Sequence, residues 1–463
     1  MAAPIQEIPK VLCFLIHNTN TNDMTKTTNR RKFLKGAAAG AAPFILPSHI
    51  WSAKTKPNDR ITMGFIGMGR QSGGLLGNFL GQDTQVLAVC DVDKTRRDDA
   101  KNKVDNRYKN KDCKAFTDYE EIVNNKDIDA VCIATPDHWH AIPTLAALKN
   151  GQDVYCEKPL THNIHEAKEV IAYVDKYDRV LQTGSMQRSS GEFRTAADLV
   201  RNGVIGNIKS VECSFGDPGR PCDLKEEEME PGLDWNKWCG PGPLRGYSSV
   251  LAPRGLHRHF PAWRHYKEYG GGMVCDWGAH HLDIAHWGLG RDGSGPVKIH
   301  KTDDKNNKRG CILEYDDGIT VKHVNGYGVH FHGCSGEVKV NRGRFELIID
   351  GEVFSSHSRK DTDKDGSVTA AYVRAEREFL KETSERVYKS TNHIRDFLGA
   401  VRSRKKPITN EIVGGGTAIA CHLMNISYYN KTSFDWDPKK NDFANGTGNA
   451  AWLTRDYRSP YSV

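Results

Sequence analysis

The sequence lacks the features that mark membrane proteins, disulfide-stabilised proteins and repeat proteins. The apolar segment at residues 36–46 is too short and too rich in alanine to span a bilayer. Twelve cysteines are scattered without a Cys-x-x-Cys pair, and Cys90, Cys132 and Cys156 fall inside apolar runs. No internal repeat is found. We therefore expect buried thiols, with no disulfide framework, metal site or membrane span.

The chain also lacks a strong excess of one charge once its N-terminal segment is set aside. The formal net charge of the 463 residues is +7. Six of the 65 Lys and Arg and two of the 58 Asp and Glu lie within residues 1–53, which leaves 59 basic and 56 acidic residues. A chain so close to neutral predicts no nucleic-acid partner. The remaining 410 residues are too many for one compact core, so two domains are expected.

Residues 1–53 are predicted to be a leader with a twin-arginine export signal. Arg30 and Arg31 precede the apolar segment, and small residues near Ser52 provide an exit from it. Because the two arginines lie far from Met1, we expect translation to start at Met24, which would leave residues 1–23 outside the protein. A disordered basic tail is the alternative. The signal predicts a periplasmic or otherwise exported protein that leaves the cytoplasm already folded with its cofactor.

A dinucleotide-binding turn follows the leader. Residues 61–66 predict a buried strand, Gly67-Met68-Gly69 a tight turn, and residues 75–80 a helix. Gly67 permits the turn, and Gly69 lets backbone N–H groups approach a pyrophosphate at the helix N-terminus. Ser72 stands where the usual pattern has its third glycine.

Asp91 closes the second predicted strand, about 20 residues after the turn, where a carboxylate accepts hydrogen bonds from an adenine ribose. A carboxylate would repel the 2′-phosphate of NADP, so NAD is the expected cofactor. The neighbouring Arg96 and Arg97 keep NADP open as the less favoured choice.

The rest of the chain divides into two patterns. Strands and helices alternate up to Gly184, which predicts a Rossmann domain over residues 54–184 with a doubly wound parallel sheet. From residue 185 to 463, a long loop at residues 216–249 and short alternating strands after residue 297 predict an α+β domain with a mostly antiparallel sheet. The fold class expected is therefore α/β plus α+β.

Two stretches carry residues suited to catalysis. Lys158, in Glu-Lys-Pro just after a strand of the nucleotide domain, can donate to a substrate oxygen beside a nicotinamide. Asp276, His280 and Asp283 share one stripe of a predicted helix after three glycines, so that a carboxylate one turn away orients a histidine base. A surface lysine and a merely structural helix are the alternatives. His281 points about 100° away from His280 around the helix, which disfavours a metal site.

These motifs together resemble the Gfo/Idh/MocA family, which includes glucose-fructose oxidoreductase and inositol dehydrogenase. The resemblance runs from about residue 58 to the end of the chain. It implies a Rossmann domain, a C-terminal open-faced sheet that forms homo-oligomer contacts, bound NAD(P) and a catalytic triad of Lys158, Asp276 and His280. The predicted cofactor-binding residues are Gly67, Met68, Gly69, Arg70, Ser72, Asp91, Thr135, Pro136, His138, His140, Glu157 and Lys158.

Substrate residues are harder to assign because the long loop departs from the family pattern. Tryptophans stack on sugar faces, and arginines and histidines donate hydrogen bonds to hydroxyls. The same side chains can equally be loop core or solvated surface. The candidates are Gln187, Arg188, Trp235, Arg258, Trp263 and His281.

The sequence thus predicts an NAD-dependent oxidoreductase that acts on a secondary hydroxyl of a small carbohydrate, a sugar or glycoside. The first alternative is a redox-neutral glycosidase or lyase, in which tightly bound NAD forms a transient keto-sugar and takes the electrons back. The second is a nucleotide-bound sugar-binding or structural protein without turnover.

Overall fold

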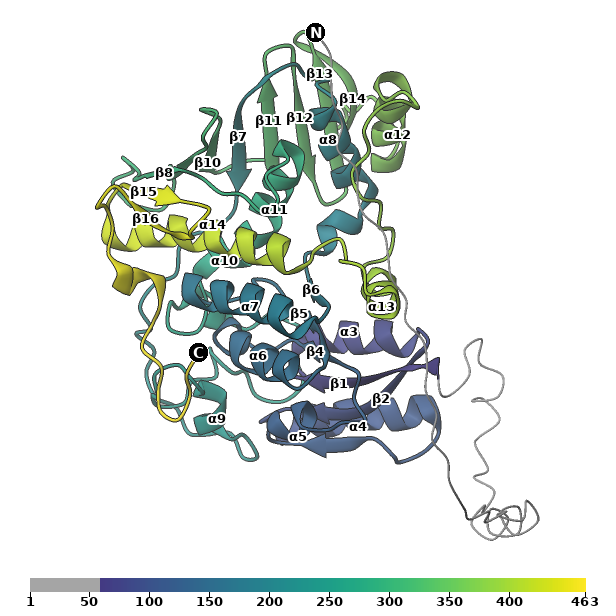
Figure 1. Ribbon diagram of the computed structural model, residues 1–463, viewed down its shortest axis with the longest axis vertical. Helices are drawn as coiled ribbons and strands as arrows, with labels where there is room; N and C mark the ends of the chain where they lie inside the picture. The colour runs from purple at the N-terminus through teal and green to yellow at the C-terminus, as the bar shows by residue number, and fades with distance from the viewer. Residues whose placement is uncertain (1–58) are drawn as a thin grey trace, which may run out of the picture. The chain divides into compact units, whose positions relative to one another are not determined.

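The computed structural model describes residues 59–463 (Figure 1). The predicted leader, with Arg30, Arg31 and the proposed start at Met24, lies outside the described residues. Two sheets organise the described part of the chain.

The first sheet is parallel, with six strands in the order β3-β2-β1-β4-β5-β6. β1 pairs with β2 on one side and with β4 on the other, so the strand order reverses at β1. Dinucleotides bind at such a reversal, beyond the carboxyl ends of the strands. The predicted doubly wound parallel sheet is confirmed. The strands are β1 (Ile61–Ile66), β2 (Thr84–Cys90), β3 (Lys114–Phe116), β4 (Ala130–Ile133), β5 (Asp153–Cys156) and β6 (Leu181–Thr183).

Helices alternate with these strands, as predicted. They are α3 (Arg70–Leu80), α4 (Lys94–Tyr108), α5 (Glu120–Val123), α6 (Ala141–Lys149) and α7 (Ile164–Tyr177). α3 begins at Arg70, earlier than the predicted start at residue 75. The sequence did not reveal its first turn because the serine and glycines at 72–74 carry no apolar pattern. Its N-terminal N–H groups therefore follow directly on the Gly67–Gly69 turn.

The second sheet has ten strands and is mostly antiparallel, with one parallel pair between β7 and β10. This architecture was also predicted, although the sequence patterns did not reveal β11, β14, β15 or β16. The strand order is β14-β13-β12-β11-β7-β10-β9-β8-β15-β16. The strands are β7 (Ile208–Ser214), β8 (Lys298–His300), β9 (Ile312–Glu314), β10 (Thr320–Val324), β11 (Val329–Gly333), β12 (Gly336–Asn341), β13 (Arg344–Ile349), β14 (Glu352–His357), β15 (Phe434–Asp437) and β16 (Asp442–Ala444).

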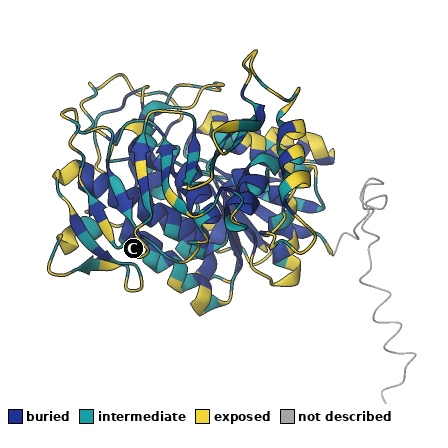
Figure 2. Ribbon diagram, turned by 90° about the horizontal axis from the view of Figure 1, so that it is seen from above, coloured by how far each residue is buried: buried dark blue, intermediate teal, exposed yellow. Residues whose placement is uncertain are grey.

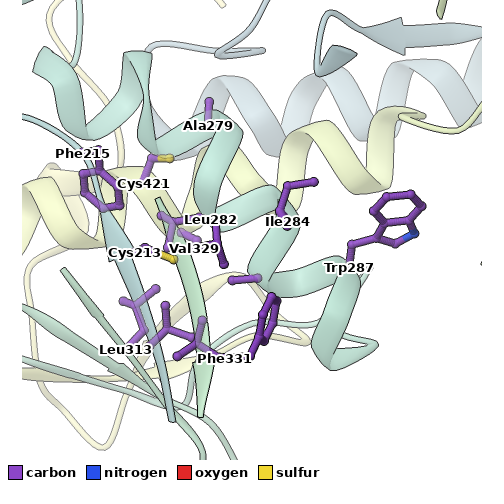
Figure 3. Close-up of a cluster of buried hydrophobic side chains, with 14 of the residues drawn as sticks. Cys213, Phe215, Ala279, Leu282, Ile284, Trp287, Leu313, Val329, Phe331 and Cys421 are labelled. Atoms are coloured by element: carbon purple, nitrogen blue, oxygen red, sulfur yellow. The ribbon is translucent and has the colours of Figure 1, made fainter. Parts of the chain in front are cut away.

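One face of this sheet is covered by α8 (Gly191–Arg201), α11 (Gly278–Leu289) and α12 (Val368–Phe379). Figure 3 shows Leu282 of α11 among Val329 and Phe331 of the sheet, all in the buried cluster. Burial of each such side chain stabilises the fold by about 1.5–3 kcal/mol. The alternate strand positions form the other face and are mostly half-buried, so this face is open.

Two C-terminal helices pack against the nucleotide-binding sheet. Phe397 of α13 (His393–Ser403) lies edge-on to Phe79 and Tyr155, with ring centroids 6.2 and 5.8 Å apart. α14 (Glu411–Asn430) packs on α7. The end of the chain therefore completes the core of its beginning, and buried residues run through both sheets (Figure 2).

Shorter elements lie in the connections between these two sheets. α9 (Trp235–Cys239) falls inside the predicted loop at residues 216–249, and α10 (Gly272–Asp276) directly precedes α11. Cys90, Cys132 and Cys156 are buried free thiols, as predicted. Within residues 59–463, no helix has both the length and the apolar content required for a membrane span.

Candidate active site

A cavity of about 1250 Å³ opens at the carboxyl ends of the parallel strands. The N-terminal half contributes residues that follow β1, β2, β3, β4 and β5, and the C-terminal half contributes residues from several separate segments. These segments include residues 251–265, residues 273–280, Arg342 and residues 460–462, and residues 186–192 and 237–238 line the cavity as well. This volume is large enough to hold both a dinucleotide and a small substrate.

The Gly67–Gly69 turn has the properties that dinucleotide binding requires. Gly67 has φ +84°, and an added Cβ would lie 2.7 Å from the backbone nitrogen of Thr135. A Cβ on Gly69 would meet no atom within 4 Å, so this backbone faces open space at the N-terminus of α3. The arrangement leaves N–H donors and a positive dipole end toward the cavity, as a pyrophosphate needs.

Two of the predicted cofactor residues in this segment have side chains that lie outside the cavity. The side chains of Met68 and Ser72 are buried and do not line the cavity; the Ser72 hydroxyl lies 3.5 Å from the Met68 sulfur. The small serine packs beneath the first turn of α3, at the position of the pattern's third glycine, so any contribution of these two residues to cofactor binding comes from their backbone. Arg70 lines the cavity and donates to the carbonyl of Arg258 at 2.8 Å.

Asp91 follows β2 and lines the cavity. Its carboxylate accepts the backbone N–H groups of Met68 at 2.6 Å and Asp93 at 2.8 Å, which ties the ribose position to the turn. Burial raises the pKa of Asp91, although Arg96 opposes this shift. Arg96 pairs with Asp93 at 3.2 Å, and Arg97 donates to the Asp91 carbonyl at 2.6 Å. Both arginines are thus engaged by protein groups, which favours NAD over NADP.

The strand ends after β4 and β5 supply the next part of the cavity wall. Thr135, Pro136, His140 and Glu157 all line it. The Thr135 hydroxyl is buried without a hydrogen-bond partner among the described residues, so it is available to a ligand. Glu157 accepts from Gln71 at 2.9 Å, and burial raises its pKa.

His138 does not join this wall, contrary to prediction. It is buried, and its two ring nitrogens face the carbonyls of Tyr269 at 3.3 Å and Trp238 at 3.0 Å. It joins the nucleotide domain to the loop that follows β7 and has no access to the cavity.

Lys158 and Asp276 form an ion pair in the cavity. The Lys158 ammonium donates to a carboxylate oxygen of Asp276 at 2.6 Å and to its carbonyl at 3.0 Å. Arg264 donates to the same carboxylate oxygen at 3.2 Å. Burial alone would raise the pKa of Asp276, but Lys158 and Arg264 outweigh it and hold the pKa below its usual value. Asp276 is therefore ionised at neutral pH.

His280 lines the same cavity but is not bonded to Asp276. The two residues lie on separate helices, α10 and α11, so the predicted single helical stripe was wrong; Trp277 stands between the helices. The Nδ1 atom of His280 is buried without a partner among the described residues. Burial and the nearby Lys158 lower the pKa of His280 well below its usual value, so the imidazole is neutral at neutral pH.

The cavity also contains ionisable groups that the sequence did not single out. Burial and the Asp276 carboxylate raise the pKa of Asp137 to about 8. Arg342, from the β12–β13 turn, lies over the Trp277 ring at 4.6 Å. Asp137 belongs to a polar cluster after β4, so position alone could have marked it. Arg342 has no such signal, because only the pairing of β12 and β13 brings it to the site.

The predicted substrate residues divide into two groups. Gln187 and Trp263 line the cavity. With its amide oriented to satisfy both neighbours, Gln187 donates to the His280 carbonyl at 3.1 Å and accepts from Arg342 Nε at 3.1 Å. Trp263 stacks under the Arg264 guanidinium at 4.3 Å. Both lie where a substrate next to Lys158 and His280 would be in reach.

The other predicted substrate residues lie elsewhere. Arg188 is 1% exposed and binds Asp283 and Asp292, and Trp235 is buried and stacked on Trp238, with ring centroids 4.6 Å apart. The His281 Nδ1 atom lies 2.6 Å from the Ser214 carbonyl, and the Arg258 side chain is exposed outside the cavity. These four assignments to the substrate site were wrong, because polar and aromatic residue types alone do not distinguish packing from ligand contact.

Residues near the C-terminus reach the cavity as well. Pro460, Tyr461 and Ser462 line it, and the Tyr461 ring lies 5.1 Å from that of Trp139. Residues 117–120, which follow β3, line the same region. Because β2 and β3 lie on the adenine side of a Rossmann sheet, this tail covers the adenine end of the cavity.

Comparisons with known proteins agree with this architecture. Residues 61–185 match the family model described as "Oxidoreductase family, NAD-binding Rossmann fold", and residues 205–463 match "Oxidoreductase family, C-terminal alpha/beta domain". The chain belongs to the Gfo/Idh/MocA oxidoreductase family. Its N-terminal half is the family's NAD-binding domain, as predicted.

Among individual relatives, 1,5-anhydro-D-fructose reductase from Ensifer adhaerens is 25% identical over 239 residues, which are 49% of this chain and 60% of that protein. A glycosyl hydrolase family 109 protein from Shewanella pealeana is 27% identical over 212 residues, 40% of this chain and 46% of that protein. The chain thus spans 60% or less of the length of these relatives.

The fold is also similar to a solved structure of levoglucosan dehydrogenase in complex with NADH. The match has a TM-score of 0.54 at 18% sequence identity and covers 81% of this chain and 99% of that one. At this identity the likeness concerns the fold alone.

Proposed function

We propose that this member of the family is an NAD-dependent enzyme that oxidises a secondary hydroxyl of a sugar or glycoside. The observation that carries the proposal is the convergence of Lys158 and His280 on the cavity that the dinucleotide-binding turn opens into. Relatives and structural neighbours named for anhydrofructose and levoglucosan support a carbohydrate substrate.

The cavity fits NAD. Gly67 and Gly69 would hold the pyrophosphate, Asp91 the adenine ribose, and the unpartnered Thr135 hydroxyl and Glu157 the nicotinamide end. NAD⁺, when bound there, supplies the acceptor for a hydride from the carbinol carbon. Trp263 and Trp277, which both line the cavity, give the substrate side two apolar surfaces.

His280 is the proposed general base, since its neutral imidazole can accept the hydroxyl proton as the carbinol is oxidised. Lys158 has three N–H donors, of which Asp276 takes two. The third is free to donate to the substrate oxygen and to stabilise negative charge on it. Asp276, assigned from sequence to orient His280, is bound instead to Lys158, and with Arg264 it fixes where the ammonium lies.

The test is to incubate purified protein with NAD⁺ and a panel of sugars and to record the near-ultraviolet absorbance of reduced nicotinamide. An increase with one or more sugars supports the proposal. Stable NAD binding with no increase for any sugar or glycoside would contradict it and indicate a binding protein without turnover.

A redox-neutral glycosidase or lyase that uses tightly bound NAD through a transient keto-sugar is the second candidate. The relative named as a glycosyl hydrolase family 109 protein favours it. Glycosides incubated with the protein without an added electron acceptor separate the two reactions. Repeated aglycone release indicates the second candidate, whereas one reduction per bound cofactor indicates the dehydrogenase.

We also propose export by the twin-arginine route and a homo-oligomer formed through the open face of the C-terminal sheet. The Arg30-Arg31 pair supports the first, and the absence of a covering helix on that face within the described residues supports the second. Replacement of both arginines by lysine should retain the protein in the cytoplasm, and light scattering should show more than one chain per particle.

A further inference from the structure

A cluster of histidines and glutamates lies on the open face of the C-terminal sheet, outside the cavity. His330 and His332 alternate along β11, so both side chains point to this face. Glu212 lies on β7 and Glu337 on β12, the two strands that flank β11. None of the four lines the cavity, and the oxidoreductase chemistry above does not use them.

The register of the strands brings the four side chains together. His330 is directly opposite Glu212 across the β7–β11 pair, and His332 is directly opposite Glu337 across the β11–β12 pair. Opposite and diagonal residues on one sheet face are within reach of long side chains. The cluster is therefore held on strands that pair at five positions on the β7 side and at four on the β12 side, rather than on a flexible loop.

Each glutamate faces one nitrogen of each histidine. Glu212 Oε2 lies 3.8 Å from His330 Nδ1 and 3.6 Å from His332 Nε2. Glu337 lies on the other side, 2.8 Å from His330 Nε2 and 3.6 Å from His332 Nδ1. His330 Nδ1 and His332 Nε2 thus share the carboxylate of Glu212, and His330 Nε2 and His332 Nδ1 share the carboxylate of Glu337.

This is the arrangement of a two-histidine, one-carboxylate metal site. Nitrogen atoms of the two histidines and a Glu212 oxygen form a group whose members all lie within 4.8 Å of one another. Bonds of about 2.0–2.2 Å from zinc to nitrogen and oxygen place tetrahedral ligands about 3.4 Å apart. The separations to Glu212 therefore need to change by only a few tenths of an ångström to accept an ion.

Glu337 provides a carboxylate for the ring nitrogens of the histidines that do not face Glu212. Metal-binding histidines usually donate their second ring N–H to a carboxylate, which fixes the tautomer and the ring orientation. His330 Nε2 already makes this contact with Glu337 at 2.8 Å. Lys339 binds Glu346 at 2.8 Å and stays 3.8 Å from Glu337. Lys322 is opposite Glu212 across the β7–β10 pair, but its side chain is exposed and forms no ion pair with Glu212.

We propose that Glu212, His330 and His332 bind one divalent transition-metal ion, for which zinc is the first candidate, and that Glu337 positions the two imidazoles from behind. In the single chain, the side chains of Glu212 and His332 are 43% and 27% exposed, so an ion can enter from solvent before two chains pair through this face.

The test is calorimetric titration of zinc chloride into the full chain after removal of metal by chelator. We expect one zinc ion per chain. Glu212→Gln and His332→Ala should each abolish this binding, and Glu337→Gln should weaken it about 10–100-fold. His300→Ala is the matched control, because His300 pairs with a single carboxylate, Glu314, on β9 and has no third partner.

Cobalt(II) supplies a second readout, since its visible spectrum reports tetrahedral binding by nitrogen and oxygen. Catalytic activity and melting temperature without metal should be unchanged in all four variants, which shows that they fold. Absence of zinc uptake by the wild-type chain would overturn the proposal. So would uptake that Glu212→Gln and His332→Ala leave at the wild-type affinity, since the ion would then bind elsewhere.

Discussion

The wall of the cavity on the cofactor side comes from the ends of neighbouring strands, whereas the opposite wall comes from segments far apart in the sequence. Gly67, Asp91, Thr135 and Glu157 each follow a strand of one parallel sheet. Arg264, His280 and Arg342 come from a long loop, a helix and a hairpin turn. Backbone topology fixes the first wall, and side-chain packing over long distances fixes the second.

This difference gives the two walls different sensitivities to mutation. A change on the cofactor side should alter NAD binding, and a change near Lys158 should alter the chemical step. Buried charged residues behind the substrate wall should alter stability alone. Five substitutions test this division.

Arg188→Met should produce the largest effect, on stability. Arg188 is 1% exposed and binds the carboxylates of Asp283 and Asp292, so its removal leaves buried charge without a partner. We expect the free energy of unfolding to fall by about 3–5 kcal/mol in denaturant titration. Arg220→Met is the control, because its pair with Asp223 is exposed and should contribute less than about 1 kcal/mol. A stable Arg188→Met protein with a raised KM for sugar would return Arg188 to the substrate site.

Lys158→Met should lower kcat about 10²–10³-fold, because the donor to the substrate oxygen is lost. NAD affinity should change little, since the dinucleotide turn is untouched. Lys237→Met, on the adenine side of the cavity and paired with Asp118 at 2.8 Å, should give the opposite result, with NAD affinity lowered and kcat retained. Steady-state kinetics and NAD titration measure both. An unchanged kcat in Lys158→Met would refute the role given to the ammonium group.

Asp137→Asn should change how stability depends on pH. The pKa of Asp137 is raised to about 8 in the folded state, so the unfolded chain releases this proton at lower pH. The contribution of Asp137 to the free energy of unfolding is therefore complete below about pH 4. It falls as the pH rises toward 8, by up to about 1.4 kcal/mol per pH unit. Asparagine lacks this ionisation. The melting temperature of Asp137→Asn relative to wild type should increase from pH 5 to pH 8, and a constant difference would contradict the raised pKa.

Gly69→Ala should weaken NAD binding on the order of tenfold, because its methyl group would occupy the space where the backbone approaches the pyrophosphate. The fold should be unaffected, since the added Cβ would meet no protein atom within 4 Å. Gly73→Ala, an exposed position in the same helix, is the control and should bind NAD normally. Equal affinities of the two variants in fluorescence titration would argue against this turn as the pyrophosphate site.

Tyr461→Ala should have the smallest effect, about a threefold loss of NAD affinity, because one aromatic contact of the adenine end is removed. kcat should stay at the wild-type value. Tyr388→Ala, an exposed tyrosine outside the cavity, provides the comparison. A change in kcat without a change in NAD affinity would move the tail to the substrate side.

The sequence predicted more of the cofactor wall than of the substrate wall. The reason is that strand ends form the first wall, whereas segments far apart in the sequence form the second. Strand ends are visible as apolar runs followed by glycine or polar residues, so the parallel sheet, the turn and the position of Lys158 could be predicted. The register of β12 and β13, which brings Arg342 to the cavity, leaves no local signal. Trp235 and Arg188 were assigned to substrate by residue type, but both are packed in the interior.

The case of Asp276 shows how far the prediction of the site could go. Asp276 and His280 are four residues apart, about one turn of a helix, and the sequence therefore predicted that they face each other. Helix α10 ends at Asp276, however, and its carboxylate turns to Lys158 from the other half of the chain. Spacing within one helix could not reveal a partner that lies 118 residues away in the sequence.

A structure of the protein with NAD and a bound sugar would test the central claim most directly. The account predicts the ammonium of Lys158 and the imidazole of His280 within hydrogen-bonding distance of one sugar hydroxyl, beside the nicotinamide ring. A sugar bound with its hydroxyls away from both groups, or a nicotinamide ring outside the space between Glu157 and His280, would contradict it.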